Sequence, residues 1–185
     1  MESNDFPLKR NITRCEAKSH LADDRNMNTS QNSLHVTCPS FGKNGQIPKK
    51  HTGFGEDISP QFSIGGLRNE VKALAIMMDD LDVPFAGELN HWLIWNLPPE
   101  STIPENIPFG AECPNGARQG LAYGRHRYRG PKQPPFIRKA HRYRFCVYGL
   151  DRSLELPATA RKKDLMQAMS GHILQTGEVI GWYQP

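Results

Sequence analysis

The sequence predicts a mainly β protein: a β-sandwich of antiparallel-rich sheets with a C-terminal helix. Short runs of alternating or continuous apolar residues recur along the chain, and segments rich in Gly and Pro separate them. Helical periodicity is confined to one stretch near the end. The 185 residues, of which 37% are hydrophobic, suit one domain with a substantial core.

The first expected strands lie between residues 34 and 67. Residues 34–38 alternate cleanly between apolar and polar side chains and should form the first strand. Residues 42–60 contain many Gly, Pro, Asn and Lys residues, so we expect a loop there, with a short strand near residues 46–48. Residues 61–67 are a further strand candidate.

The centre of the sheet is predicted from longer runs. Residues 71–78 are apolar except for one Lys, which is typical of a strand buried on both faces. We expect this strand to end on the carboxylates that follow it, with Asp80 and Asp82 at its mouth and Pro84 stopping it. Further strands are expected at residues 91–97 and 142–150.

The single helix is expected over residues 159–176. Thr159 can cap its first turn, and Gly177 is a suitable residue to end it. Gly171 inside the helix costs roughly 1 kcal/mol relative to Ala but does not forbid it. The apolar stripe lies at Leu165, Met169 and Ile173. Residues 179–183 then form a last strand-like segment.

Residues 1–33 are polar and aperiodic, so we expect a mobile tail before a domain at residues 34–185. The tail lacks the apolar segment of a secretory signal, and no window approaches 18 apolar residues. These features predict a cytoplasmic protein without a transmembrane segment.

The four cysteines are scattered, which disfavours a zinc site or a disulfide framework. We expect Cys38 and Cys146 to be buried free thiols.

The formal net charge of +4 is unevenly distributed. Nine Lys and Arg residues and no carboxylate lie between Arg118 and Arg144, which leaves 14 cations against 19 carboxylates elsewhere. Such a segment attracts anions, although a solvated charged face explains it about as well. The residues expected to form a basic rim are Arg125, Arg127, Arg129 and Lys132.

Residue types able to bind an anion occur in two blocks of the chain. Asp80 and Asp82 follow the apolar strand, and His91 opens the next one. In the second block, strand alternation puts His141 and Tyr143 on one face, so that both can point into one cavity. The loop between the blocks is stiffened by proline and contains Gly130 and Pro131.

Four motifs in one order resemble the phosphatidylethanolamine-binding protein family, in particular its bacterial branch of Raf kinase inhibitor-like proteins (the YbhB/YbcL type). They are Asp80-x-Asp82-x-Pro84, His91-Trp92, Tyr128-x-Gly130-Pro131-x-x-Pro134-Pro135 and His141-Arg142-Tyr143-x-Phe145. The resemblance covers roughly residues 34–184. It implies a β-sandwich that binds small phosphate-like anions or a phosphoethanolamine headgroup without a cofactor, and that regulates a protein partner such as a protein kinase or protease.

The residue chemistry fits that ligand class. Asp80 could take an amine, while His91, His141 and Tyr143 could donate to phosphate oxygens. Asp82 would join them as a ligand-binding residue, beside Gly130 and Pro131, or would only brace its own loop.

Three alternatives are weaker. A histidine with a carboxylate could act as general acid and base of a phosphate-ester hydrolase, but the sequence has no recognisable nucleophile motif, so we predict a binding protein and not an enzyme. Asp80, Asp82, His91 and His141 are acceptable metal ligands, but they lack a tight ligand spacing, so we predict no metal. Nucleic-acid binding is disfavoured because few aromatic residues accompany the basic segment.

Overall fold

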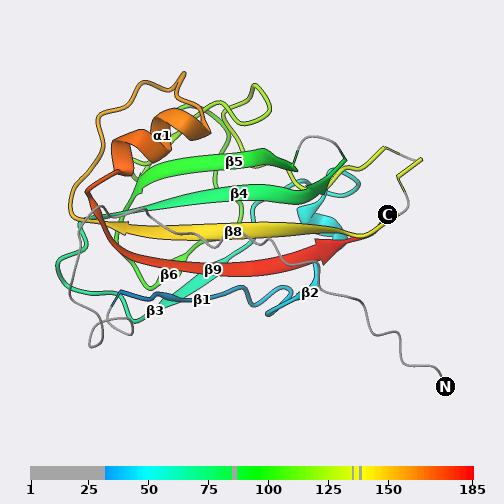
Figure 1. Ribbon diagram of the computed structural model, residues 1–185, viewed down its shortest axis with the longest axis horizontal. Helices are drawn as coiled ribbons and strands as arrows, with labels where there is room; N and C mark the ends of the chain where they lie inside the picture. The colour runs from blue at the N-terminus through cyan, green and yellow to red at the C-terminus, as the bar shows by residue number, and fades with distance from the viewer. Residues whose placement is uncertain (1–31, 85–86, 135, 138) are drawn as a thin grey trace.

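The protein is an open sandwich of two β-sheets with a helix on its outer face (Figure 1). The computed structural model describes residues 32–84, 87–134, 136–137 and 139–185. The large sheet has the strand order β2-β9-β8-β4-β5-β7, and the small sheet has the order β1-β3-β6. The predicted fold class is therefore confirmed, whereas the predicted tail lies almost entirely outside the described residues.

The described strands, β1 to β9, divide between the two sheets. The large sheet contains β2 (Gly45–Gln46), β4 (Ala73–Val83), β5 (Gly87–Leu97), β7 (Arg118–Gln119), β8 (His141–Leu150) and β9 (Ile173–Tyr183). The small sheet contains β1 (His35–Thr37), β3 (Phe62–Gly65) and β6 (Thr102–Ile103). A 3-10 helix, η1 (Lys49–His51), and one α-helix, α1 (Lys162–Met169), complete the described elements. The strand pairs are antiparallel except β2 with β9.

The core divides into two layers, one on each face of the large sheet. On the inner face, Ile76, Trp92 and Phe145 pack against Phe62 and Ile64 of the small sheet. On the outer face, Met77 and Trp95 pack with Leu165 and Met169 of α1. Residues 73–80 of β4 are all buried. The apolar run predicted this for residues up to 78, and the burial of Asp79 and Asp80 extends beyond it.

Strand β4 does not stop at the carboxylates. Asp79 and Asp80 remain in register with Arg144 and Tyr143 of β8, and the strand continues to Val83. Asp residues are depleted in strands, which is why sequence reasoning placed them at its mouth. Ladder pairing with neighbours on both sides outweighs that preference.

The predicted helix over residues 159–176 is wrong at both ends. Arg161 is the N-cap residue, and the Asp164 carboxylate accepts the Arg161 N–H at 2.9 Å. The helix ends at Met169 because Gly171 has a φ of 81°, a left-handed conformation that leaves the helix. Strand β9 then begins at Ile173, six residues earlier than predicted, and pairs with the whole of β8.

The cysteine prediction is correct for Cys38, a buried free thiol, but wrong for Cys146, which is disulfide-bonded. Cys113 is also free and buried. Within the described part of the chain, neither helix has the length and apolarity needed to span a bilayer.

Candidate functional site: an imidazole and carboxylate cluster at one end of the sheet

Four of the predicted site residues meet at one end of the large sheet. At this end, on the right in Figure 1, β4 and β9 finish while β5 and β8 begin. Asp80 lies directly opposite Tyr143, and both side chains share the inner face with Met78 and Phe145. We call Asp80, His91, His141 and Tyr143 the end cluster.

His91 joins the end cluster because of a β-bulge. Met78 pairs with Trp92, but the next residue, Asp79, pairs with Asn90, so His91 is an extra residue in β5. Strict alternation would put His91 on the outer face with Leu93. A bulge re-aims the side chain of the inserted residue. The imidazole consequently packs edge-on to Tyr143 on the inner face, with ring centroids 5.4 Å apart.

Asp80 and His141 form a buried pair. His141 Nδ1 lies 2.8 Å from Asp80 Oδ2, and both side chains are about 95% buried, with 6% and 5% of their areas exposed. The other oxygen, Oδ1, accepts the backbone N–H of Asp82 at 2.9 Å. Asp80 is thereby fixed from two sides, and its charge is directed at the imidazole.

Tyr143 lies beside Asp80 on the inner face of the sheet and packs into the inner core layer. Burial, and then the charge and hydrogen bonding of Asp80, raise the pKa of Tyr143 well above its usual value. The phenol therefore stays protonated. Because Tyr143 is only 1% exposed, it forms the floor of the end cluster rather than its open side.

His91 is held by a backbone carbonyl. Its Nδ1 lies 2.9 Å from the carbonyl oxygen of Arg129, and its ring also contacts Tyr123 edge-on at 5.2 Å. A carbonyl only accepts hydrogen bonds, so Nδ1 carries the proton. Burial lowers the pKa of His91 despite the opposing effects of that hydrogen bond and of Asp80, which favours the neutral imidazole.

The other nitrogen of each imidazole is open. Among the residues that the structure describes, no hydrogen bond satisfies Nε2 of His91 or of His141. Each imidazole is thereby anchored through Nδ1 and keeps one ring nitrogen available for a hydrogen bond to a ligand.

The Gly130–Pro131 segment is positioned by Asp57, in a stretch that the sequence analysis predicted only as a loop. The Asp57 carboxylate accepts the Gly130 N–H at 2.7 Å and also pairs with Arg127. Gly130 has no space for a side chain, because a Cβ there would lie 2.0 Å from the His51 carbonyl oxygen. Asp57 was missed because its only sequence signal is an Asp in a Gly-rich turn, where Asp is common for local reasons.

Asp82 makes contacts that fit the alternative role of bracing. Its carboxylate accepts the Arg142 backbone N–H at 2.8 Å and both Nε and an Nη of the guanidinium, at 2.8 and 2.7 Å. Burial raises the pKa of Asp82, but the bonds from Arg142 together outweigh it and leave the pKa lowered. This pair ties the end of β4 to the start of β8.

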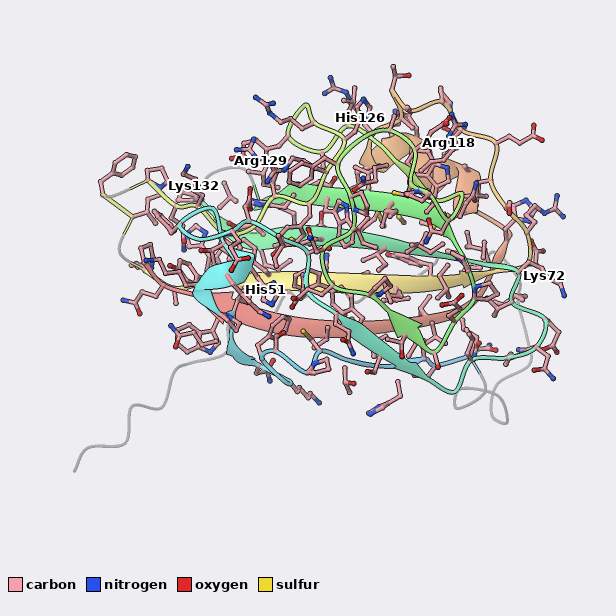
Figure 2. All side chains as sticks on the ribbon, turned by 180° about the vertical axis from the view of Figure 1, so that it is seen from behind. His51, Lys72, Arg118, His126, Arg129 and Lys132 are labelled. Atoms are coloured by element: carbon pink, nitrogen blue, oxygen red, sulfur yellow. The ribbon has the colours of Figure 1, made fainter. Side chains whose placement is uncertain are left out.

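The basic rim contains two kinds of cation. Arg127 lies over the Phe109 ring and pairs with Asp57, and Arg129 lies 4.5 Å above the Tyr123 ring. Arg125 and Lys132 are exposed. Figure 2 shows Arg129 and Lys132 at the same end of the molecule as His51, with Lys72 at the other end. No group of three or more potential metal-ligating side chains occurs among the described residues.

Comparisons with known proteins cover most of the chain. The family model described as phosphatidylethanolamine-binding protein matches residues 37–184. The UPF0098 protein of Pyrococcus horikoshii is 45% identical over 147 residues, 78% of this chain and 73% of that protein. The crystal structure of a phosphatidylethanolamine-binding protein homologue from Chlamydia trachomatis superimposes with a TM-score of 0.72 at 35% identity, covering 83% of this chain and 99% of that one. YbcL of E. coli shares the fold, with a TM-score of 0.73 at 21% identity and coverages of 83% and 99%.

Proposed function

Because this chain belongs to the phosphatidylethanolamine-binding protein family, we propose that its end cluster binds a small phosphate-like anion or a phosphoethanolamine headgroup. The observation that carries the proposal is the pair of imidazoles, each anchored through Nδ1 and open at Nε2. Rigid elements hold both rings before any ligand arrives, so little conformational entropy is lost on binding.

The proposed roles differ among the predicted residues. His91 and His141 contact the ligand through Nε2, and Gly130 and Pro131 shape the adjacent loop. Asp80, which is 4% exposed and already accepts two hydrogen bonds, orients His141 rather than taking an amine. Asp82 and Tyr143 support the walls of the site.

The basic rim adds attraction at longer range. Arg129 lies against Tyr123, the ring that also contacts His91, so its charge stands beside the proposed anion site. Exposed cations raise the local concentration of anions and accelerate their association, and salt screens this effect.

We further propose that Arg125 and Lys132 contact a regulated protein partner of the kinase or protease type. Charge reversal at both positions should abolish partner capture while small-anion binding survives.

Binding is favoured over catalysis for a chemical reason. A hydrolase needs a nucleophile or an activated water aligned with its acid and base. The described neighbours of the two imidazoles are the phenol rings of Tyr123 and Tyr143 and the Asp80 carboxylate, each of whose oxygens already accepts a hydrogen bond. Turnover of a phosphomonoester that disappears in His91→Ala would contradict this assignment.

Calorimetric titration with inorganic phosphate and with O-phosphoethanolamine tests the proposal. We expect saturable binding that His91→Ala and His141→Ala each weaken about tenfold or more, since each variant removes one ligand hydrogen bond to a charged group. His172→Ala is a matched control, because His172 is also paired with an aspartate, Asp151, at 3.1 Å. Equal affinities in all four proteins would contradict the proposal.

A further inference from the structure

We propose that the loops around the end cluster dock on the surface of a phospholipid bilayer that carries anionic headgroups. This inference deepens the proposed function and rests on it for the headgroup, because the end cluster then takes the phosphate of a lipid that remains in its bilayer. It follows from where the exposed aromatic side chains lie and from the charges beside them.

Large hydrophobic side chains are exposed at four positions among the described residues. They are Phe54, Phe109, Tyr123 and Phe136, with 39%, 56%, 50% and 82% of their areas exposed. Single exposed rings are ordinary, but several that gather at one site mark an interaction surface. Phe54, Tyr123 and Phe136 adjoin the end cluster or its loops, and we call these three side chains the aromatic tips.

Two aromatic tips flank the end cluster. The ring of Tyr123 packs edge-on to His91 of β5, with centroids 5.2 Å apart. The ring of Phe54 stacks on Tyr183 of β9, with centroids 6.0 Å apart, and Tyr183 pairs with His141 of β8. Because β8 and β4 lie between β9 and β5, these two rings stand on the two sides of the end cluster.

The third tip, Phe136, is the most exposed large hydrophobic side chain in the described part of the chain. It belongs to the segment that precedes β8, which is drawn in yellow and extends beyond the right end of the large sheet in Figure 1. The Ile137 N–H donates to the Pro134 carbonyl oxygen at 2.9 Å, so Phe136 stands on a closed turn. A ring that is 82% exposed can enter an apolar phase without giving up packing in its own fold.

The charges beside the tips suit an anionic surface. The Arg129 guanidinium lies 4.5 Å above the Tyr123 ring, and the Lys132 side chain lies against the loop that carries Phe54. Residues 118–144 contain nine Lys and Arg residues and no carboxylate. Each cation close to an anionic membrane surface strengthens binding about fivefold. Rings and cations together form the pattern by which peripheral proteins bind the bilayer interface.

A bilayer suits the aromatic tips better than a protein partner does. The aromatic anchors of protein interfaces fill matching pockets, whereas a bilayer interface accepts separate rings at any spacing and favours tyrosine. The three tips stand on three separate loops, after η1, at residues 122–125 and before β8. The protein contact proposed for Arg125 and Lys132 depends on charge, so it should survive the loss of the rings.

The test is co-sedimentation of the full chain with vesicles of phosphatidylethanolamine and phosphatidylglycerol. We expect saturable binding that high salt weakens and that the double variant Phe54→Ser/Phe136→Ser weakens at least about tenfold. Equal vesicle binding by the double variant and the parent protein would overturn the inference.

Phe109→Ser is the matched control. Phe109 is also exposed, but the Arg127 guanidinium lies 3.9 Å above its ring, and the next residue donates its backbone N–H to His126. Figure 2 shows His126 set back from the end of the molecule that carries Lys132. Vesicle affinity should therefore change by less than about twofold in Phe109→Ser.

Calorimetry with O-phosphoethanolamine separates this inference from the proposed function. Its affinity should be the same in the double variant and the parent protein, because neither ring belongs to the end cluster. Binding of O-phosphoethanolamine without any vesicle binding would overturn the inference and leave the proposed function intact. Vesicle binding that depends on the rings, without binding of O-phosphoethanolamine, would support docking and overturn the proposed function.

A depth measurement checks that the ring itself enters the bilayer. The fluorescence of Phe136→Trp should be quenched by vesicles whose lipids are brominated in the upper acyl chains, whereas Phe109→Trp should show no added quenching. The natural tryptophans contribute the same background to both variants. Equal quenching in the two variants would contradict docking through the aromatic tips.

Discussion

Two neighbouring aspartates, Asp79 and Asp80, lie on opposite faces of the same strand and have different bonding partners. Asp79 accepts from Lys162 Nζ at 2.8 Å and from Asn90 at 3.0 Å, and lies 3.7 Å from the guanidinium of Arg144. It thereby joins α1 to the outer face of the sheet. Among the described residues, the side chain that pairs with Asp80 on the inner face is His141, with Nδ1 2.8 Å away.

The two aspartates differ in how much hydrogen-bonding capacity their partner side chains have left for a ligand. Lys162 and Arg144, the cations around Asp79, also hydrogen-bond to Glu88, so this network links four charged side chains within the fold. The histidine beside Asp80 keeps a second nitrogen that the described residues leave open. A buried charge whose partner retains unused bonding capacity is the feature that distinguishes a binding site from a structural ion pair.

The largest expected effect is on the structural side. Asp79→Ala should lower the free energy of unfolding by about 3 kcal/mol, because it removes a buried carboxylate that accepts from Lys162 and Asn90 and leaves Glu88 as the remaining carboxylate beside Arg144. Urea unfolding measures this loss. If Asp79→Ala were no less stable than Asp80→Asn, the structural role given to Asp79 would be wrong.

Asp80→Asn should mainly affect binding. Asn keeps the size of the side chain and its amide oxygen can still accept the Asp82 N–H, so the stability loss is smaller than for Asp79→Ala. The His141 imidazole loses the carboxylate that orients it, and phosphate affinity should fall about tenfold or more in calorimetry. Asp151→Asn is the matched control, because Asp151 also pairs with a histidine, His172, at 3.1 Å but follows the far end of β8, and it should leave phosphate affinity within about twofold.

Gly130→Ala tests the loop beside His91. A Cβ there would lie 2.0 Å from the His51 carbonyl oxygen, so the loop must shift, which should cost about 1–3 kcal/mol of unfolding free energy. Anion affinity should fall with it. Gly124→Ala is the comparison on the same rim, with a φ of 71° but open space around it. Its cost should stay near 1 kcal/mol, with anion affinity unchanged.

The smallest effect concerns pH. Burial lowers the pKa of His91 in the folded protein, so the unfolded chain binds the extra proton more readily. The contribution of His91 to stability is therefore present above about pH 6.5 and is lost as the pH falls below it. In urea unfolding between pH 7.5 and 5.5, His91→Gln should lose less stability than the parent protein; an equal or steeper loss would contradict a buried neutral imidazole.

The sequence could predict part of the site because side chains alternate between the two faces of a strand. Strand alternation places His141 and Tyr143 on one face, and the apolar run before Asp80 brings that residue to the same end of the sheet. His91 could not be oriented from sequence, because its direction depends on a bulge that only the pairing of β4 with β5 reveals.

Other features escape the sequence because they are backbone interactions. The Arg129 carbonyl that fixes His91 has no side-chain signal, and Asp57 acts through the Gly130 N–H. The end of α1 was misplaced because Gly171 was treated as a weak interior residue, whereas its left-handed conformation ends the helix and lets β9 begin.

Nitrogen-detected NMR of the histidine side chains is the most direct test of the central claim. Before ligand is added, the spectra should show His91 as the tautomer with its proton on Nδ1. Adding methyl phosphate should shift the Nε2 resonances of His91 and His141 with one saturable dissociation constant and leave those of His126 and His172 unchanged. Shifts at His126 or His172 without any at His91 and His141 would contradict the account, because the anion would then bind outside the end cluster.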